Sequence, residues 1–140
     1  PNRRRPGGGP VIVLDTCALI FDALTPDRLS GAARAALEDG EAEGILACAD
    51  ISLWEIAMLV SKKRLDPGTD STTFCRLVLD ARGIRVLPIT PEIATGSVEV
   101  ALALGDPADR LIAAAARFHH APLVTADRNL RRSASVTTVW

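Results

Sequence analysis

The stretch DPADRLIAAAARFHHAPLVTAD, residues 106–127, contains a helix and a strand, with an acid near one end of each. Apolar residues recur at three- and four-residue intervals over 108–119, which predicts an amphipathic helix. The apolar run 123–125 then predicts a short buried strand. Asp109 lies in the first turn of the helix, and Asp127 lies two residues after the strand. If the strand runs back alongside the helix, both carboxylates reach one edge of a sheet.

Strands and helices alternate in the same way over the rest of the chain. Glycines follow several helical segments, as is typical of helix ends: Gly40, Gly83 and Gly105. The alternation predicts an α/β fold with a mostly parallel sheet covered on both faces, in which ligands bind beyond the carboxyl ends of the strands. The expected strands are 11–14, 44–48, 84–89, 123–125 and 136–140, and the expected helices are 29–37, 52–64, 70–82, 92–104, 108–119 and 128–131.

Composition bounds the domain organisation and the compartment. In a chain of 140 residues, 48% hydrophobic and 4% aromatic residues favour one aliphatic core of helices on a sheet. The net charge of -1 indicates no particular partner. Cys17, Cys48 and Cys75 lack zinc-site spacing and fit reduced thiols of the cytoplasm. No apolar run is long enough to span a membrane. We expect one domain over residues 11–140. Residues 1–10 are expected to form a flexible basic tail, which is not a secretion signal because no signal-type apolar core follows it.

Two further acids complete a candidate site. Asp15 follows the strand-like run VIVL in the way that Asp127 follows its strand. Glu55, like Asp109, is expected in the first turn of a helix. Carboxylates that meet at one edge repel one another, and a hard cation such as Mg²⁺, which prefers oxygen ligands, offsets the repulsion and suits phosphodiester hydrolysis. The candidate catalytic and metal-binding residues are therefore Asp15, Glu55, Asp109 and Asp127.

Each of these acids also fits a local capping role. The tetrapeptide SLWE fits a capping box, with Ser52 as the N-cap and Glu55 at the third helical position. The tetrapeptide DPAD is similar, with Asp106 as the N-cap and Asp109 at the third position. The two strand-end acids can cap the short helices that follow them. Capping and metal binding are compatible, because a helix N-terminus favours the ionised carboxylate that a metal needs.

Three segments together resemble the PIN domain, and in particular the VapC-type toxins of type II toxin–antitoxin pairs: VIVLDTCALI, SLWEIAMLV and GDPADRLIAAAARFHHAPLVTADRNL. The resemblance extends from residue 11 to residue 140. Cys17, directly after the Asp-Thr pair, is a mild departure from the pattern. The four acidic positions of that family fall, in order, on Asp15, Glu55, Asp109 and Asp127.

The resemblance implies a three-layer α/β/α sandwich and an endoribonuclease that depends on Mg²⁺ or Mn²⁺. A metal-activated water would hydrolyse RNA and leave a 5′-phosphate and a 3′-hydroxyl. A homodimer, a small antitoxin encoded beside the gene, and a cytoplasmic location are also implied. The residues expected to support the acids are Thr16, Asp106, Arg110 and Thr125.

Basic residues near the acids are candidates for RNA binding. Arg128, Arg131 and Arg132 follow the last acid, and guanidinium groups bind RNA phosphates. Lys62 and Lys63 are interpreted instead as solvated cations near the end of a helix.

Two other classes of function remain open. One is an α/β enzyme with Asp15 as nucleophile or phospho-acceptor, although a phosphatase pattern would have an acid at Cys17 and a receiver would have a lysine at a late strand end. The other is a PIN-like module that binds RNA or a protein partner without cleaving. Four intact acids argue against that module, since a scaffold has no need to hold repelling charges together.

Overall fold

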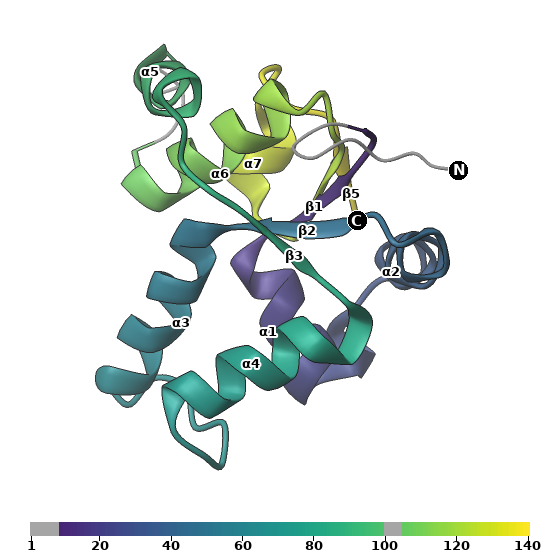
Figure 1. The fold of residues 1–140 in the computed structure, drawn as a ribbon, viewed down its shortest axis with the longest axis vertical. Coiled ribbons are helices and arrows are strands. Elements are labelled where there is room, and N and C mark those ends of the chain that lie inside the picture. The colour runs from purple at the N-terminus through teal and green to yellow at the C-terminus, as the bar shows by residue number, and fades with distance from the viewer. Residues whose placement is uncertain (1–8, 100–104) are drawn as a thin grey trace.

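Five parallel strands form the centre of the molecule. The computed structural model describes residues 9–99 and 105–140. The strands lie in the order β3-β2-β1-β4-β5, and every described pairing is parallel (Figure 1). The predicted α/β fold with a mostly parallel sheet is confirmed. The strand bounds are β1 Ile12–Leu14, β2 Leu46–Ala49, β3 Arg85–Leu87, β4 Leu123–Val124 and β5 Thr138–Val139.

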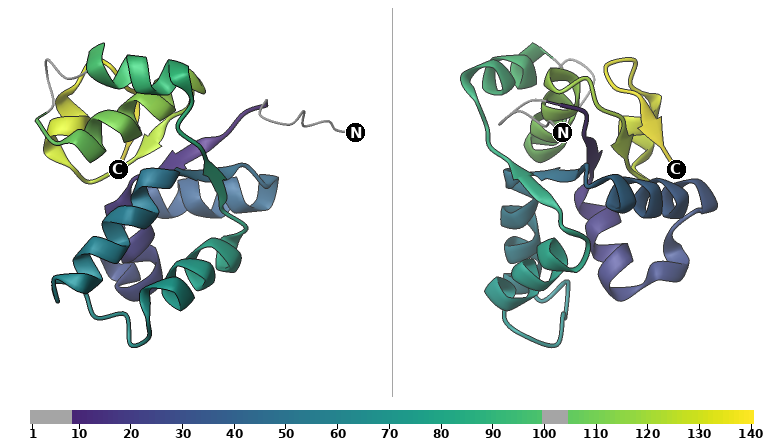
Figure 2. Two further views of the ribbon diagram at one scale, coloured as in Figure 1. Left: turned by 60° about the vertical axis from the view of Figure 1, so that its left-hand side comes forward. Right: turned by 45° about the vertical axis from the view of Figure 1, so that its right-hand side comes forward.

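Helices cover both faces of this sheet. Figures 1 and 2 show α5, α6 and α7 on one face, with α1, α3 and α4 on the other. Helix α2 packs with the second group. The molecule is therefore the predicted three-layer α/β/α sandwich. The helix bounds are α1 Thr16–Leu24, α2 Gly31–Glu43, α3 Asp50–Ser61, α4 Ser71–Arg82, α5 Pro91–Glu99, α6 Pro107–Phe118 and α7 Arg128–Arg132, with a 3₁₀ helix, η1, at Pro26–Arg28.

Neighbouring strand residues supply two apolar cores, one on each face of the sheet. Val13 and Leu123 pack against the α5 and α6 side, whereas Leu14 and Val124 pack against the α1 and α2 side. All four side chains are fully buried. Successive side chains of a strand point to opposite faces, so a strand covered on both faces needs apolar residues at every position. This explains why β1, β2 and β4 are continuous apolar runs in the sequence.

Helix α2 does not stop before Gly40, as we predicted, and that prediction is wrong. It runs on to Glu43 and ends at Gly44, which has a left-handed backbone with φ of 68°. Gly40 is buried within the helix. A Cβ there would lie 3.1 Å from Leu46 Cγ, closer still to Leu46 Cδ2, and 3.2 Å from Ile12 Cδ1. The glycine is required by the close approach of α2 to the sheet and does not mark a helix end.

Helix α3 also differs from its prediction. It starts directly after β2, with Ala49 as the N-cap residue and Asp50 as the first helical residue. Ser52 is therefore not an N-cap, and SLWE is not a capping box. Glu55 consequently lies in the second turn of α3 and not in the first. The sequence pattern failed here because the strand continues into the helix without a loop that would mark the boundary.

Helix α1 was not among the predicted helices, and the other differences concern the ends of elements. The predicted helix 70–82 is confirmed as α4. Strands β3 and β5 are shorter than the predicted runs 84–89 and 136–140. The predicted helix 92–104 corresponds to α5, and its predicted end, like positions 1–8 of the expected tail, lies outside the described residues. Within the described part of the chain, no helix has the length and apolar character needed to cross a membrane.

Candidate active site at the carboxyl edge of the sheet

A hollow of about 350 Å³ opens where β1 and β4 end. The structure brings the four predicted acids to this one hollow, together with a fifth, Asp106. Helices α1, α6 and α7 each begin at an acid of the hollow. The residues that line it are Asp15, Thr16, Cys17, Glu55, Asp106, Asp109, Ala126 and Asp127.

Asp15 is the most buried of these acids, with 5% of its surface exposed. Its Oδ1 accepts a hydrogen bond of 2.8 Å from the Thr16 amide, so it caps α1. Its Oδ2 accepts from the Thr125 hydroxyl at 2.6 Å and from Cys17 Sγ at 3.5 Å. Burial raises the pKa of the Asp15 carboxyl, and the Asp127 carboxylate adds to that rise, while the hydrogen bonds oppose it. Capping and a place in the hollow therefore coexist in one side chain.

Thr125 connects the ends of the two central strands. This fully buried residue directly follows β4 and donates its hydroxyl hydrogen to Asp15, at the end of β1. The same oxygen accepts a hydrogen bond of 3.0 Å from the Asp127 amide. Thr125 therefore fixes the orientation of the Asp15 carboxylate and the backbone that carries Asp127.

Glu55 reaches the hollow from α3. The Thr16 hydroxyl donates a hydrogen bond to its Oε1, and the Thr16 and Ser52 hydroxyls are hydrogen-bonded at 2.9 Å. Burial raises the pKa of the Glu55 carboxyl, with repulsion from Asp15 and Asp106 as smaller causes. Sequence reasoning missed Ser52 as a site residue. Its position three residues before Glu55, on the same face of one helix, is the signal that identifies it.

The start of α6 has the geometry that DPAD predicts. Asp106 is the N-cap, and its Oδ1 accepts from the amides of Ala108 at 2.8 Å and Asp109 at 3.4 Å. Asp109 occupies the third helical position. Residues that follow Asp109 on the same face are fully buried, namely Ile112, Ala113 and Ala116. This apolar face sets α6 against the sheet and directs Asp109 to the edge where the strands end.

Ionisation of Asp109 is opposed by its surroundings. Its side chain has no hydrogen-bond partner among the described residues, in contrast to Asp15. Its pKa is raised from 3.8 to about 7, first by burial and then by repulsion from the other carboxylates, which are Asp15, Asp106, Asp127 and Glu55. A nearby positive charge would therefore favour the ionised form of Asp109.

The remaining predicted residues lie around the hollow. Asp127 caps α7, because its Oδ1 accepts from the Leu130 amide at 3.0 Å. Arg110 Nη2 donates to the Gly105 carbonyl oxygen at 3.0 Å and so ties the preceding segment to α6. The candidate RNA-binding arginines do not line the acidic hollow and instead surround a separate one, formed with Thr138: Arg128, Arg131 and Arg132.

The donor set of the acidic hollow fits a hard divalent cation. Its charged side chains are carboxylates from separate elements, and these oxygen ligands are the type that Mg²⁺ and Mn²⁺ prefer. Among the described residues, no three acidic, histidine or cysteine side chains already converge as a ligand set for one ion. Mg²⁺ keeps several waters and needs only one or two carboxylates directly, so acids spread around the wall of a hollow suffice.

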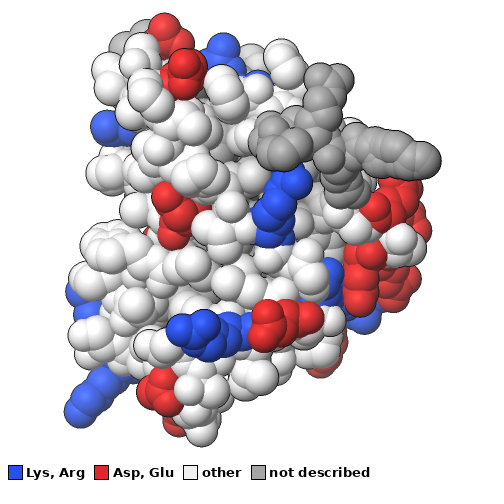
Figure 3. Space-filling model, viewed as in Figure 1, with Lys and Arg blue, Asp and Glu red and all other residues white. Residues whose placement is uncertain are grey.

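Other acidic side chains of the molecule form a solvated surface. Glu38, Asp39, Glu41 and Glu43 are exposed on α2, and acidic side chains gather over this helix at the right of Figure 3. Glu41 is paired with Arg82 at 2.8 Å. Exposed acids of this kind lack the burial that raises the pKa values in the acidic hollow.

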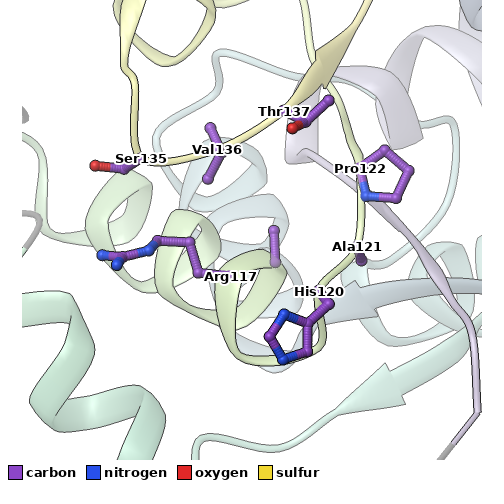
Figure 4. Close-up of a pocket in the computed structure, with 8 residues that line it drawn as sticks. Arg117, His120, Ala121, Pro122, Ser135, Val136 and Thr137 are labelled. Carbon is purple, nitrogen blue, oxygen red and sulfur yellow. The ribbon is translucent and has the colours of Figure 1, made fainter.

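Another hollow, of about 650 Å³, lies where β4 and β5 begin, at the end of the sheet opposite the acids. Figure 4 shows Arg117 and His120 at the end of α6, facing the segment Ser135, Val136 and Thr137 that precedes β5. No acid lines this hollow. It therefore offers no carboxylate ligands for a cation, and the chemistry is assigned to the acidic edge.

Comparisons with known proteins identify the family. The family model of the PIN domain matches residues 12–135. Ribonuclease VapC22 of Mycobacterium tuberculosis (strain ATCC 25618 / H37Rv) is 36% identical over 132 residues, which cover 92% of this chain and 98% of that protein.

Two solved structures have a similar fold. VapBC2 from Rickettsia felis, bound to a DNA fragment from their promoter, matches with a TM-score of 0.71 and 18% identity, over 91% of this chain and 96% of that chain. A toxin–antitoxin complex from Klebsiella pneumoniae matches with a TM-score of 0.60 and 21% identity, over the same shares of the two chains, 91% and 96%. At these identities the two likenesses show the fold.

Proposed function

The chain belongs to the PIN domain family, and on this basis we propose that it is a metal-dependent endoribonuclease that acts as the toxin of a toxin–antitoxin pair. One observation carries the proposal: acids from the ends of β1 and β4 and from α3 and α6 line a single hollow. The identity to a protein named as a ribonuclease supports RNA as the substrate. Family membership leaves the phosphatase and receiver alternatives without support.

The residues that would hold the cation are Asp15, Glu55, Asp109 and Asp127. When bound, Mg²⁺ or Mn²⁺ would supply positive charge to the reacting phosphate and lower the pKa of a water. Asp15 is held by several hydrogen bonds, so its carboxylate needs little reorganisation when the phosphate arrives. A bound cation would offset the burial and the repulsion that raise the pKa of Asp109, and it would keep this carboxylate ionised. Attack by water on phosphorus displaces the 3′ oxygen and leaves a 5′-phosphate and a 3′-hydroxyl.

A non-cleaving module is the weaker candidate. The Thr125 hydroxyl donates a hydrogen bond that orients Asp15, and the Thr16 hydroxyl donates one that orients Glu55. A binding scaffold gains nothing from holding repelling carboxylates in defined orientations, whereas a cation site and its chemistry require it.

A small cognate antitoxin is the expected partner. The similarity in fold to VapBC2 and to a toxin–antitoxin complex supports this expectation. We further expect a homodimer and a cytoplasmic location, in which the RNA substrate is available. Co-expression with the neighbouring gene should give a complex without nuclease activity, and failure of the two products to co-purify would count against the toxin assignment.

The proposal is tested by RNA cleavage with the purified protein. We expect cleavage of single-stranded RNA in Mg²⁺ or Mn²⁺, its loss in EDTA, and its loss in the Asp15→Asn variant. The 5′ ends of the products should be phosphorylated. Cleavage that persists in EDTA, or products with a 2′,3′-cyclic phosphate, would show that this site does not act in the proposed way.

A further inference from the structure

Three arginines of α7 surround a second hollow, which we call the arginine hollow. It measures about 400 Å³ and is lined by Arg128, Arg131, Arg132 and Thr138. The arginines occupy positions i, i+3 and i+4, so they share one face of the helix. Leu130 is fully buried and fixes the opposite face to the core. The short helix is thus anchored on one side and presents guanidinium groups on the other.

These arginines have no anionic partner within the described part of the protein. All three are exposed, and none forms an ion pair or a side-chain hydrogen bond with a described residue. Arg82 shows the contrasting case, because it pairs with Asp22 at 2.7 Å and with Glu41 at 2.8 Å. Guanidinium groups that gather without a partner repel one another, and an external anion relieves that repulsion. Phosphate is the anion whose geometry their paired donors match.

The far wall of the arginine hollow belongs to the edge strand β5. The strand bonds to β4 through the carbonyl oxygens of Thr137 and Val139, which accept from Leu123 and Thr125. In a parallel ladder, the backbone amide and carbonyl groups of the residue between these two, Thr138, point away from β4. The Thr138 amide therefore faces the open edge of the sheet, and its hydroxyl group is available beside the arginines. Both groups can donate to an oxygen of a bound anion.

The arginine hollow and the acidic hollow are joined by α7. Asp127 caps the helix on the acidic side, and Arg131 follows four residues later. At about 1.5 Å per residue, the helix separates them by about 6 Å along its axis. The two hollows therefore lie beside the same short helix, which lets one RNA strand contact both.

We propose that the arginine hollow binds backbone phosphate of the RNA strand close to the bond cleaved in the acidic hollow. This inference rests on the proposed ribonuclease function and adds to it a substrate-positioning site. The bound RNA would then run across the molecule from the acidic hollow, over α7, toward the edge strand β5.

An acidic segment of a protein partner is the competing occupant. Stable protein–protein contacts depend on buried apolar or aromatic anchors in pockets. The arginine hollow is lined by three arginines and a threonine, without an apolar side chain. That chemistry suits a phosphate backbone better than a peptide.

The test compares two triple variants that remove the same charge. One carries Arg128→Ala, Arg131→Ala and Arg132→Ala. The control carries Lys62→Ala, Lys63→Ala and Arg64→Ala, three exposed cations after α3 that do not line either hollow. Both are built on Asp15→Asn to prevent cleavage, and the probe is a labelled single-stranded oligouridine in Mg²⁺. Its affinity is measured between about 50 and 200 mM salt.

We expect the arginine variant to lose about 0.7 from the slope of log affinity against log salt for each phosphate contact, or about 2 in total. The control should keep the slope of the Asp15→Asn parent. A third variant with lysine at the three arginine positions should keep most of the slope but bind more weakly, because it keeps charge and loses the paired donors. In the active protein the alanine changes should raise KM more than they lower kcat.

The outcomes separate this inference from the function on which it rests. If the wild-type protein does not cleave RNA, the proposed function fails. If it cleaves RNA but the arginine variant keeps the parental slope, the arginine hollow is not an RNA site. If that variant keeps the slope and no longer binds the co-expressed antitoxin, the hollow belongs to the protein partner, and the inference is overturned.

Discussion

Single hydrogen bonds decide how each carboxylate of the acidic hollow is held. Asp15 accepts from Thr16, Thr125 and Cys17 and is therefore fixed in orientation. Asp109 accepts no side-chain hydrogen bond from a described residue, and its ionised form is opposed by burial and by its neighbours. A bound cation would stabilise both carboxylates, and the two differ in that Asp15 is already held in one orientation.

Substitutions at Asp106 and Asp109 should have different effects, one mainly on stability and the other mainly on catalysis. Asp109→Asn removes a repelled charge, so we expect loss of RNA cleavage with little loss of stability. Asp106→Ala removes the N-cap of α6 and should lower the free energy of unfolding by about 0.5–2 kcal/mol while much activity remains. RNA cleavage and the urea midpoint of both variants check this. An active Asp109→Asn beside an inactive Asp106→Ala would reverse the assignment.

Thr125→Val tests whether an orienting hydroxyl matters for activity. The substitution removes the donor to Asp15 and the acceptor for the Asp127 amide. Loss of such supporting bonds at metal sites typically lowers affinity or activity about 10- to 100-fold. Cleavage rate and Mg²⁺ titration are the measurements. Thr73→Val is the matched control, since Thr73 bonds to Asp70 at the start of α4. Equal activity of the two variants would contradict the assigned role.

At the scale of elements, the packing of α2 on β1 and β2 depends on one position without a side chain. Gly40 faces Leu46 and Ile12 at distances that leave no room for a Cβ. A Cβ placed at Gly31, at the start of the same helix, would meet no neighbouring atom within 4 Å. The two glycines therefore serve different purposes within one element.

The pair gives an internal comparison for stability. Gly40→Ala should lower the free energy of unfolding by about 1–3 kcal/mol, as in overpacked cores. Gly31→Ala should be neutral or raise it by about 0.4–1 kcal/mol, because alanine restricts the unfolded chain. Urea unfolding of both variants checks the prediction. A Gly40→Ala protein as stable as the wild type would show that α2 can move away from the sheet at no cost.

At the scale of the whole molecule, the acidic hollow couples folding to pH and to metal. The pKa of Asp109 is higher in the folded protein, about 7, than its ordinary value of 3.8. Between these pH values the folded state binds more protons than the unfolded state, so this group's contribution to stability falls as pH rises. Burial and the Arg85 charge lower the pKa of half-buried His119. The contribution of His119 to stability therefore falls as pH falls, which is the opposite of the Asp109 contribution.

The difference between wild type and Asp109→Asn isolates the Asp109 contribution. In EDTA, the wild type should lose stability relative to the variant as pH rises from about 4 to about 7. Added Mg²⁺ should stabilise the wild type most at the upper end of this range, by about 2.7 kcal/mol at a concentration 100 times Kd. Urea unfolding at a series of pH values measures both effects. A relative gain in wild-type stability with pH in EDTA would contradict the raised pKa.

The sequence by itself determined the features that one segment encodes alone. The apolar spacing of α6, the N-cap at Asp106, the apolar run of β4 and the alternation of strands with helices follow from local geometry and periodicity. Asp15, Asp109 and Asp127 could be placed at strand and helix ends for the same reason, whereas the predicted place of Glu55 in the first turn of its helix was wrong. The pattern of a parallel sheet then implied that those ends meet at one edge.

Only the tertiary structure decided contacts between distant segments. The glycine within α2, the bond from Thr125 to Asp15 across 110 positions, and the Ser52–Thr16–Glu55 contacts all join separate elements. Periodicity describes which face of an element is buried, but it does not state which neighbour lies there or how closely. Those distances arise when two faces pack, and they determine why Gly40 is a glycine and how each carboxylate is held.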